Sequence, residues 1–286
     1  MNNENKPNII NWFPGHMAKT KREIKEKLDL IDIVYEVLDA RMPISSKIID
    51  LDELVKNKKR IIIVTKYDLC DKEKTDKFIK QYKEKYPVLV FDLKNANNKD
   101  ISELINLTNN LLKDINETRK NKGLKPRVFR ALVVGAPNVG KSTLINRISK
   151  KNSVKTGNRA GVTKGISWIR IANTIELMDT PGILYPKIET KEIGLNLASL
   201  TSINEDILDK EEIASYIVTY LYHNYKDILI DRYKLDNLEF NLEELFTSIA
   251  KSTNSYKKGN IVDFEKVYTI IINDLKEGRI KNITFD

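Results

Sequence analysis

The feature that most constrains this fold is the stretch GAPNVGKS at residues 135–142, which follows the apolar run RALVVG and leads into STLINRI. It matches the pattern G-x-x-x-x-G-K-S. Gly135 and Gly140 let the backbone curl so that its N–H groups face a β-phosphate. Lys141 offers a cation to the β- and γ-phosphates, and Ser142 a hydroxyl to Mg²⁺. An ordinary Gly-rich turn is the alternative, but the strand and the helix stand where a phosphate loop needs them.

Apolar, β-branched runs alternate with amphipathic segments over the first two thirds of the chain. This alternation is typical of a mostly parallel sheet covered by helices on both faces, so we predict the α/β class. Strands are expected at residues 33–38, 61–65, 88–91, 131–135, 166–172 and 175–178, with helices at 72–85, 101–115 and 141–149.

The character of the sequence changes after the stretch DTPGILYP. From Lys191 onward Pro is absent and apolar residues follow helical spacing, notably over residues 210–222, 242–251 and 263–276. Asn241 and Asp263 are plausible helix caps. We therefore predict two domains, a nucleotide-binding domain at residues 1–186 and a small all-helical domain at residues 187–286.

A second phosphate-related motif is IELMDTPG, an apolar strand that ends in Asp179. Its carboxylate is placed to lie beside Mg²⁺, and Gly182 leaves a backbone N–H free to sense a γ-phosphate. Between the two motifs, Thr163 in RAGVTKG is the candidate for a mobile loop that closes over the metal. A lone Thr would be weak evidence, but this one lies in a Gly-flanked loop just before a predicted strand.

The stretch IIIVTKYDL points to the base. An apolar strand ends in Thr65, Lys66 and Asp68, which match the pattern T-K-x-D. In this pattern the Asp accepts hydrogen bonds from guanine N1–H and N2–H₂. Adenine lacks this pair of donors, so Asp68 favours GTP over ATP. Taken alone, TKYD could be a surface turn; beside the phosphate loop it indicates a guanine reader.

The motif order is base, then phosphate, then Mg²⁺ and γ-phosphate, whereas Ras-like GTPases run phosphate, Mg²⁺, base. Because nucleotide contacts depend on spatial placement, a circularly permuted chain can build the same pocket. The expected fold is thus a P-loop GTPase domain with circularly permuted motif order, followed by the helical domain. In this order the segment after Gly182 leads directly into the helical domain, and a change at the γ-phosphate could reorient that domain.

The chain resembles the YlqF-related group of circularly permuted GTPases over nearly its whole length. The matching stretches are INWFPGHMAK, DARMPISS, TKYD, GAPNVGKSTLINRI, KTGNRAGVTKG, DTPGILYPK and DFEKVYTIIINDLKEGRI. The resemblance implies a cytoplasmic GTPase that binds the large ribosomal subunit late in its assembly and contacts ribosomal RNA with both domains. Because intrinsic GTPases turn over slowly until a partner completes the site, we expect a GTP hydrolase of low intrinsic activity that the ribosomal particle stimulates.

Two positions depart from the group's pattern. Thr65 stands where Asn is usual, which is expected to loosen the base-reading loop without removing the contacts of Asp68. The later base-binding loop reads FDLKNA, with Leu93 in the place of the usual Ser, so that a backbone N–H near Lys94 is left to bind the guanine oxygen.

The water-orienting Gln of many GTPases is replaced here by Ile183, whose alkyl side chain cannot orient water. The resemblance places FPGHMAK near the nucleotide, so His16 is the candidate to position the attacking water; a surface or RNA-contacting role is the alternative. Asn138 matches a phosphate-loop Asn that helps to hold K⁺ in related GTPases, with a plain turn-forming role as its alternative.

The complete predicted site has three parts. The catalytic residues are His16, Lys141, Thr163 and Gly182, and the Mg²⁺ ligands are Ser142, Thr163 and Asp179. The residues that bind GTP or GDP are Thr65, Lys66, Asp68, Lys94, Asn138, Val139, Gly140, Lys141, Ser142, Thr143 and Gly182.

The formal net charge of +9 is unevenly distributed. Residues 187–286 sum to −5 and the remainder to +14, which favours RNA as a partner over a mere compositional bias toward Lys. No apolar run approaches the roughly 18 residues that span a bilayer, and the single Cys70 fits a reducing compartment. We expect a cytoplasmic monomer that binds neither membrane nor DNA.

Two other functions remain open on the sequence. A GTP-dependent helper of RNA modification would bind isolated tRNA rather than ribosomal subunits. A nucleotide sensor that does not hydrolyse GTP, suggested by Ile183, would bind GTP without turnover.

Overall fold

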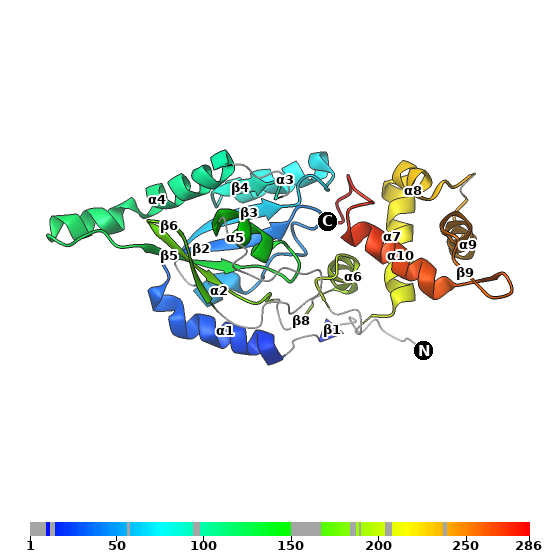
Figure 1. Ribbon diagram of the computed structural model, residues 1–286, viewed down its shortest axis with the longest axis horizontal. Coiled ribbons are helices and arrows are strands. Elements are labelled where there is room, and N and C mark those ends of the chain that lie inside the picture. Colours follow the sequence, from blue (N-terminus) through cyan, green and yellow to red (C-terminus); the bar gives the residue numbers. More distant parts are fainter. Residues whose placement is uncertain are drawn as a thin grey trace, which may run out of the picture.

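The computed structural model describes residues 10–11, 15–55, 58–93, 98–149, 167–183, 187–188, 190–203, 208–236 and 239–286. Its centre is a six-stranded sheet in the order β4-β3-β2-β5-β7-β6 (Figure 1). The strands are β2 (Ile33–Asp39), β3 (Lys59–Thr65), β4 (Val88–Phe91), β5 (Phe129–Val134), β6 (Ser167–Ala172) and β7 (Ile175–Asp179). All neighbours pair in parallel except β6, which runs antiparallel to β7 at one edge. The α/β prediction is confirmed.

The central strands are buried because helices cover both faces of the sheet. Every residue of β2 is buried, and so is every residue of β3 after Lys59, which explains their near-continuous apolar sequences. One face packs against α4 (Asn98–Asn121) and α5 (Lys141–Ser149). The other packs against α1 (Gly15–Lys27), α2 (Leu51–Val55) and α3 (Lys72–Lys83).

The permuted chain order is visible in the sheet. The phosphate-loop strand β5 lies in the middle between β2 and β7, although β2, β3 and β4 all precede it in the chain. The chain leaves the edge strand β4 and returns to the centre through α4, whose 24 residues reach about 36 Å. This one long crossover permits the base-reading strand to come first.

The residues after the sheet are mainly helical. They form α6 (Lys191–Ser199), α7 (Lys210–Asn224), α8 (Lys226–Tyr233), α9 (Leu242–Thr253) and α10 (Phe264–Lys276), with a short hairpin of β9 (Tyr256–Lys257) and β10 (Ile261–Val262) between α9 and α10. The predicted caps are present: the Asn241 side chain accepts hydrogen bonds from the Glu243 and Glu244 amides, and that of Asp263 from the Lys266 amide.

Helices α7 to α10 group at one end of the sheet, with α6 between them and the strands, and the last residues of the chain return to the strand ends (Figure 1). The predicted division at residues 186 and 187 falls just before β8 (Lys187–Ile188), which pairs with β1 (Ile10–Asn11) near the other end of the chain. Among the described residues, no helix has both the length and the apolar character needed to cross a membrane.

Candidate functional site

The three sequence motifs meet at one edge of the sheet. Parallel strands place their carboxyl ends together, and here β3 ends at Thr65, β5 at Val134 and β7 at Asp179. The base-reading, phosphate and metal motifs each begin at one of these ends. The structure therefore brings together parts of the chain that lie up to about a hundred residues apart.

The phosphate loop has the shape its glycines require. A Cβ on Gly135 would overlap the carbonyl oxygen of Val37, and Gly140 has a φ of +99°, which side chains rarely adopt. Asn138 also has a positive φ, +61°. Lys141 curls back over the loop, and its Nζ donates hydrogen bonds to the carbonyl oxygens of Gly135 at 3.0 Å and Ala136 at 2.7 Å.

The other phosphate-loop residues lie just before α5 or in its first turn. Val139 is buried, Ser142 half-buried and Thr143 exposed. The first N–H groups of a helix have no partner within it, and together with the helix dipole they favour an anion. Lys141 is the cation nearby: burial lowers its pKa to about 8, and the neighbouring Asp179 acts in the opposite direction, in favour of the charged form.

Asp179 is a buried carboxylate in need of a partner. It is fully buried at the end of β7, and neither side-chain oxygen makes a hydrogen bond of ordinary geometry within the described part of the chain. Burial raises its pKa to about 6, and Lys141 offsets this only in part. Ionised carboxylates are rarely buried without a compensating charge, so Asp179 fits a site for a cation.

The donors available here suit Mg²⁺. That ion is commonly held by one or two carboxylates, waters and the substrate's phosphate oxygens rather than by a full protein cage. The described residues contain no cluster of three His, Cys, Asp or Glu side chains able to hold a metal. Asp179 and the Ser142 hydroxyl are thus suitable ligands, while Thr163 lies outside the described residues.

The base-reading loop is tied to the phosphate loop. The Thr65 hydroxyl donates to the carbonyl oxygen of Val139 at 2.5 Å, and Lys66 Nζ donates to that of Asn138 at 2.5 Å. The Thr65 hydroxyl thus links the two loops, and the predicted loosening relative to Asn stays a prediction. Asp68 follows in a turn, half-buried.

The second base-binding loop begins beside the phosphate loop. Leu93 is buried just after β4, and a Cβ on Gly140 would lie 3.0 Å from its Cδ1. Arg147 on α5 donates from Nε to the Leu93 carbonyl oxygen at 3.0 Å. Lys94, the next residue, lies outside the described residues, so its predicted contact with guanine stays a prediction.

The segment after Asp179 packs on the phosphate loop. A Cβ on Gly182 would come within 2.7 Å of Pro137 Cα, so a side chain there would push the two segments apart. The Ile183 amide donates to the Gly135 carbonyl oxygen at 3.1 Å, and its side chain is fully buried. Ile183 is thus a packing residue, in agreement with its unsuitability for orienting water.

Two predicted residues have limited structural descriptions. His16 lies in α1, but its side chain is outside the described residues, so its catalytic role stays a prediction. Asn138 uses its side-chain Nδ2 to donate to the Thr201 carbonyl oxygen at 2.5 Å and to Thr201 Oγ1 at 3.0 Å. This link to the end of α6 is compatible with the turn-forming role, and the K⁺ role stays a prediction.

Asp39 and Arg41 belong to the site and were not predicted. Asp39 ends β2, next to β3 in the sheet, and its Oδ2 accepts a hydrogen bond from Lys66 Nζ at 2.8 Å. The available signal was a carboxylate directly after a buried strand, in DARMPISS, a stretch to which the sequence reasoning assigned no role.

Comparisons with known proteins agree with this geometry. A family model described as "50S ribosome-binding GTPase" matches residues 130–251. The chain is 41% identical to "Ribosome biogenesis GTPase A" of Bacillus licheniformis over 97% of this chain and 98% of the relative, and 38% identical to that of Bacillus cereus over 97% and 94%.

Solved structures give the same result. The chain is similar to GNP-bound YlqF from T. maritima, with a TM-score of 0.64, 26% identity and coverage of 94% of this chain and 97% of that one. A GDP-bound structure of TM YlqF also matches with a TM-score of 0.64 and covers 93% of this chain. The chain therefore belongs to the ribosome biogenesis GTPase A family of circularly permuted, YlqF-related GTPases.

Proposed function

We propose that this protein is a Mg²⁺-dependent GTPase that acts late in the assembly of the large ribosomal subunit and is stimulated by the ribosomal particle. The observation that carries the proposal is the buried Asp179 beside the buried Lys141, at the strand ends where the guanine-reading loop also begins; within the described part of the chain its carboxylate oxygens make no hydrogen bond of ordinary geometry. GTP hydrolysis itself follows from membership of the family.

Each site residue has a proposed role in binding GTP or Mg²⁺. Lys66 and Asp68 read the guanine, and Lys141 with the amides at the start of α5 binds the phosphates. Ser142, Thr163 and Asp179 would hold Mg²⁺, which when bound supplies positive charge to the β- and γ-phosphate oxygens. The Gly182 amide would sense the γ-phosphate.

The hydrolytic step needs a group to position water. Ile183 cannot do so, because its alkyl side chain is buried against the sheet. We assign this role to His16 at the start of α1. Intrinsic GTPases of incomplete sites can turn over slower than about once per thousand seconds. A slow basal rate, raised when a ribosomal particle orders the site, follows from this arrangement.

The proposed partner is the large subunit and its ribosomal RNA. The names of the relatives and of the matching family point to the ribosome. The excess of +14 on residues 1–186 supports contact with RNA phosphates, since each neutralised phosphate releases counterions. We further propose that the protein works as a monomer in the cytoplasm.

The test is GTP hydrolysis in a K⁺ buffer, with and without purified large subunits, at fixed salt because RNA binding depends on salt. Purified small subunits and isolated tRNA serve as comparison RNAs. We expect large subunits alone to accelerate phosphate release, and Asp179→Asn to abolish the acceleration. Equal acceleration by tRNA would favour the RNA-modification helper.

One observation favours a second candidate. The buried Ile183 leaves the usual water-orienting position occupied by a packing residue, which suits a sensor that binds GTP without turnover. Tight GTP binding with no phosphate release in the presence of any ribosomal particle would support the sensor and refute the stimulated GTPase.

A further inference from the structure

The stretch DARMPISS at residues 39–46 begins with a buried ion pair. Asp39 and Arg41 have side chains 0% and 1% exposed. The Arg41 guanidinium grips both carboxylate oxygens, with Nε 3.1 Å from Oδ1 and Nη2 2.9 Å from Oδ2. Bidentate geometry of this kind fixes the orientation of both groups.

The same carboxylate holds a second cation. Lys66 Nζ lies 2.8 Å from Asp39 Oδ2, and it also donates to the Asn138 carbonyl oxygen in the phosphate loop. Lys66 has a φ of 56°, a conformation that a residue with a side chain adopts only where its surroundings enforce it. Asp39 thus holds the ammonium group that joins the base-reading loop to the phosphate loop.

Arg41 also contacts the C-terminal part of the chain. Its Nη1 donates to the Leu275 carbonyl oxygen in α10 at 2.8 Å, and its own carbonyl oxygen accepts from the Phe285 amide at 2.8 Å. Arg41 therefore connects Asp39 to the last helix and to the residues that follow it.

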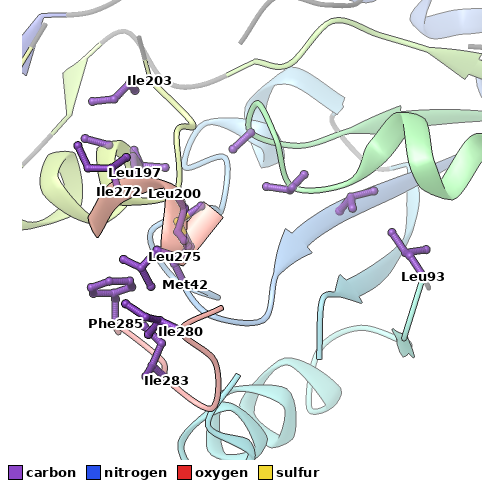
Figure 2. Close-up of a cluster of buried hydrophobic side chains, with 14 of the residues drawn as sticks. Met42, Leu93, Leu197, Leu200, Ile203, Ile272, Leu275, Ile280, Ile283 and Phe285 are labelled. Atoms are coloured by element: carbon purple, nitrogen blue, oxygen red, sulfur yellow. The ribbon is translucent and has the colours of Figure 1, made fainter. Parts of the chain in front are cut away.

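Those last residues, 280–286, are packed against the base-reading loop. The Asn282 amide donates to the Leu69 carbonyl oxygen at 2.7 Å, and the Asp71 amide donates to Thr284 Oγ1 at 3.2 Å. Figure 2 shows Ile280 and Phe285 gathered with Met42 and Leu275 in one buried apolar cluster. The segment is thus fixed by apolar burial and by hydrogen bonds to loops of the site.

We infer that Asp39 and Arg41 are positioning residues that couple guanine-nucleotide binding to the docking of the C-terminal segment, residues 280–286, through Lys66. The inference rests on the proposed role of Lys66 at the guanine. Binding that orders Lys66 stabilises the segment, and by reciprocity a docked segment raises the affinity for nucleotide.

Coupling through Lys66 predicts which nucleotides stabilise the C-terminal segment. Lys66 serves the base, which GDP and GTP share, so both nucleotides should tighten the C-terminal segment equally. If the coupling ran through Gly182 instead, it would depend on the γ-phosphate, and only a GTP analogue would tighten the segment. GDP therefore distinguishes the two: it tightens the segment if Lys66 carries the coupling and has no effect if Gly182 does.

The experiment is hydrogen exchange of the full chain, followed by mass spectrometry, without nucleotide, with GDP and with a non-hydrolysable GTP analogue. The reporters are peptides covering residues 280–286, which include the Asn282 and Phe285 amides. GDP affinity is measured on the same proteins by calorimetry. We expect both nucleotides to slow exchange in this segment to the same extent.

Variants of Arg41 distinguish a loss of the coupling from a general loss of folded structure. Arg41→Gln removes the guanidinium and should weaken GDP binding about tenfold, the size typical of losing a group that orients a ligand-binding residue. Arg41→Lys keeps a cation beside Asp39 but shortens the reach to Leu275, so it should retain most of the affinity and lose the effect of nucleotide on exchange. It replaces Arg41→Gln if that variant does not fold.

Arg127→Gln is the matched control, because Arg127 also grips one carboxylate, that of Asp32, with two nitrogens, just before the start of β2. It should leave affinity and coupling unchanged. The inference would be overturned if GDP did not change the hydrogen-exchange rate of residues 280–286. It would also be overturned if Arg41→Gln and Arg127→Gln lost the same amount of GDP affinity. Lys66→Met tests the underlying assignment: undiminished GDP binding in that variant would refute the role of Lys66 itself.

Discussion

The side-chain hydroxyl of Thr65 donates a hydrogen bond to the carbonyl oxygen of Val139, with 2.5 Å between the two oxygens. Both residues are fully buried, and this contact ties the end of β3 to the phosphate loop. An acceptor left without a partner in such a place costs roughly 1–3 kcal/mol. Thr65 therefore provides one side-chain link between the two loops, beside the hydrogen bond from Lys66 to the Asn138 carbonyl oxygen.

Thr65→Val should weaken GDP binding about tenfold, which corresponds to roughly 1.4 kcal/mol. Valine keeps the shape of the side chain but removes the donor, so the two loops lose one of their two side-chain links without a change in packing, while that of Lys66 remains. Calorimetric titration with GDP measures the effect. Thr108→Val is the control, because Thr108 is also buried and hydrogen-bonded, to Tyr35 and Leu104, but away from the loops. Equal affinities in the two variants would contradict the prediction.

Gly182→Ala should reduce GTP hydrolysis by more than about tenfold while GDP binding falls less, because the loss of one correctly placed amide donor typically costs that much or more. The added Cβ would lie 2.7 Å from Pro137 Cα and displace the segment that senses the γ-phosphate. Single-turnover phosphate release and GDP affinity are measured together.

The matched control for this change is Gly259→Ala. Gly259 lies in the β9–β10 turn with a φ of +85°, and nothing lies near its Cβ position. This variant should lose stability through backbone strain yet keep basal hydrolysis. A normal hydrolysis rate in Gly182→Ala would show that this segment tolerates displacement.

Asp179→Asn should stabilise the protein free of nucleotide and Mg²⁺ while abolishing Mg²⁺-dependent hydrolysis. A buried carboxylate whose pKa is raised to about 6 is ionised at pH 7 at a cost to folding, and a neutral amide avoids that cost. We expect a gain of about 1–3 kcal/mol, measured by urea unfolding in EDTA. Asp76→Asn, at an exposed position on α3, is the control. A less stable Asp179→Asn protein would mean that the carboxylate already has a partner.

Asn138→Gly tests the proposed K⁺ site. Glycine accepts the positive φ of 61° at this position, so the loop can keep its shape while the side chain is removed. If Asn138 holds K⁺, hydrolysis by the unchanged protein is faster in K⁺ than in Na⁺ and the difference disappears in the variant. Equal rates in both salts for the unchanged protein would contradict a role of Asn138 in holding K⁺.

The parts of this molecule that the sequence predicted are those fixed by local patterns. Continuous apolar runs identified the buried parallel strands, and side-chain chemistry identified the caps Asn241 and Asp263. The three nucleotide motifs could be placed together because each follows a strand and the carboxyl ends of parallel strands share one edge. The strand order, with β5 in the centre, is then what allows the base reader to precede the phosphate loop.

What could not be predicted depends on partners far apart in the chain. The role of Arg41 requires Leu275 and Phe285, which lie more than 230 positions away and come to it only when the end of α10 and the residues after it fold back beside the loop that follows β2. Ile183 is likewise buried among apolar side chains, and its amide bonds to the Gly135 carbonyl oxygen, contacts that no spacing rule reveals. Local composition contains no signal for such contacts.

Cys70, the single cysteine, offers a direct probe of the base-reading loop. Its side chain is buried, its Sγ donates to the Tyr67 carbonyl oxygen at 3.3 Å, and burial raises its pKa to about 11. Because the raised value keeps the thiol protonated well above neutral pH, reaction with a thiol reagent at pH 8 should require the loop to open first. GDP should slow the reaction further.

The pH dependence of Cys70 labelling follows from the raised pKa of its thiol. In the folded protein the thiolate fraction stays small until the pH nears 11, whereas an open loop ionises near the ordinary value of about 8.5. Labelling that proceeds through opening should therefore rise about tenfold per unit up to pH 8.5 and then level off. Thr284→Ala, which removes the acceptor of the neighbouring Asp71 amide, should raise the rate at every pH. A rate that rises steadily to pH 11, unaffected by GDP, would show that the thiol reacts from the closed loop.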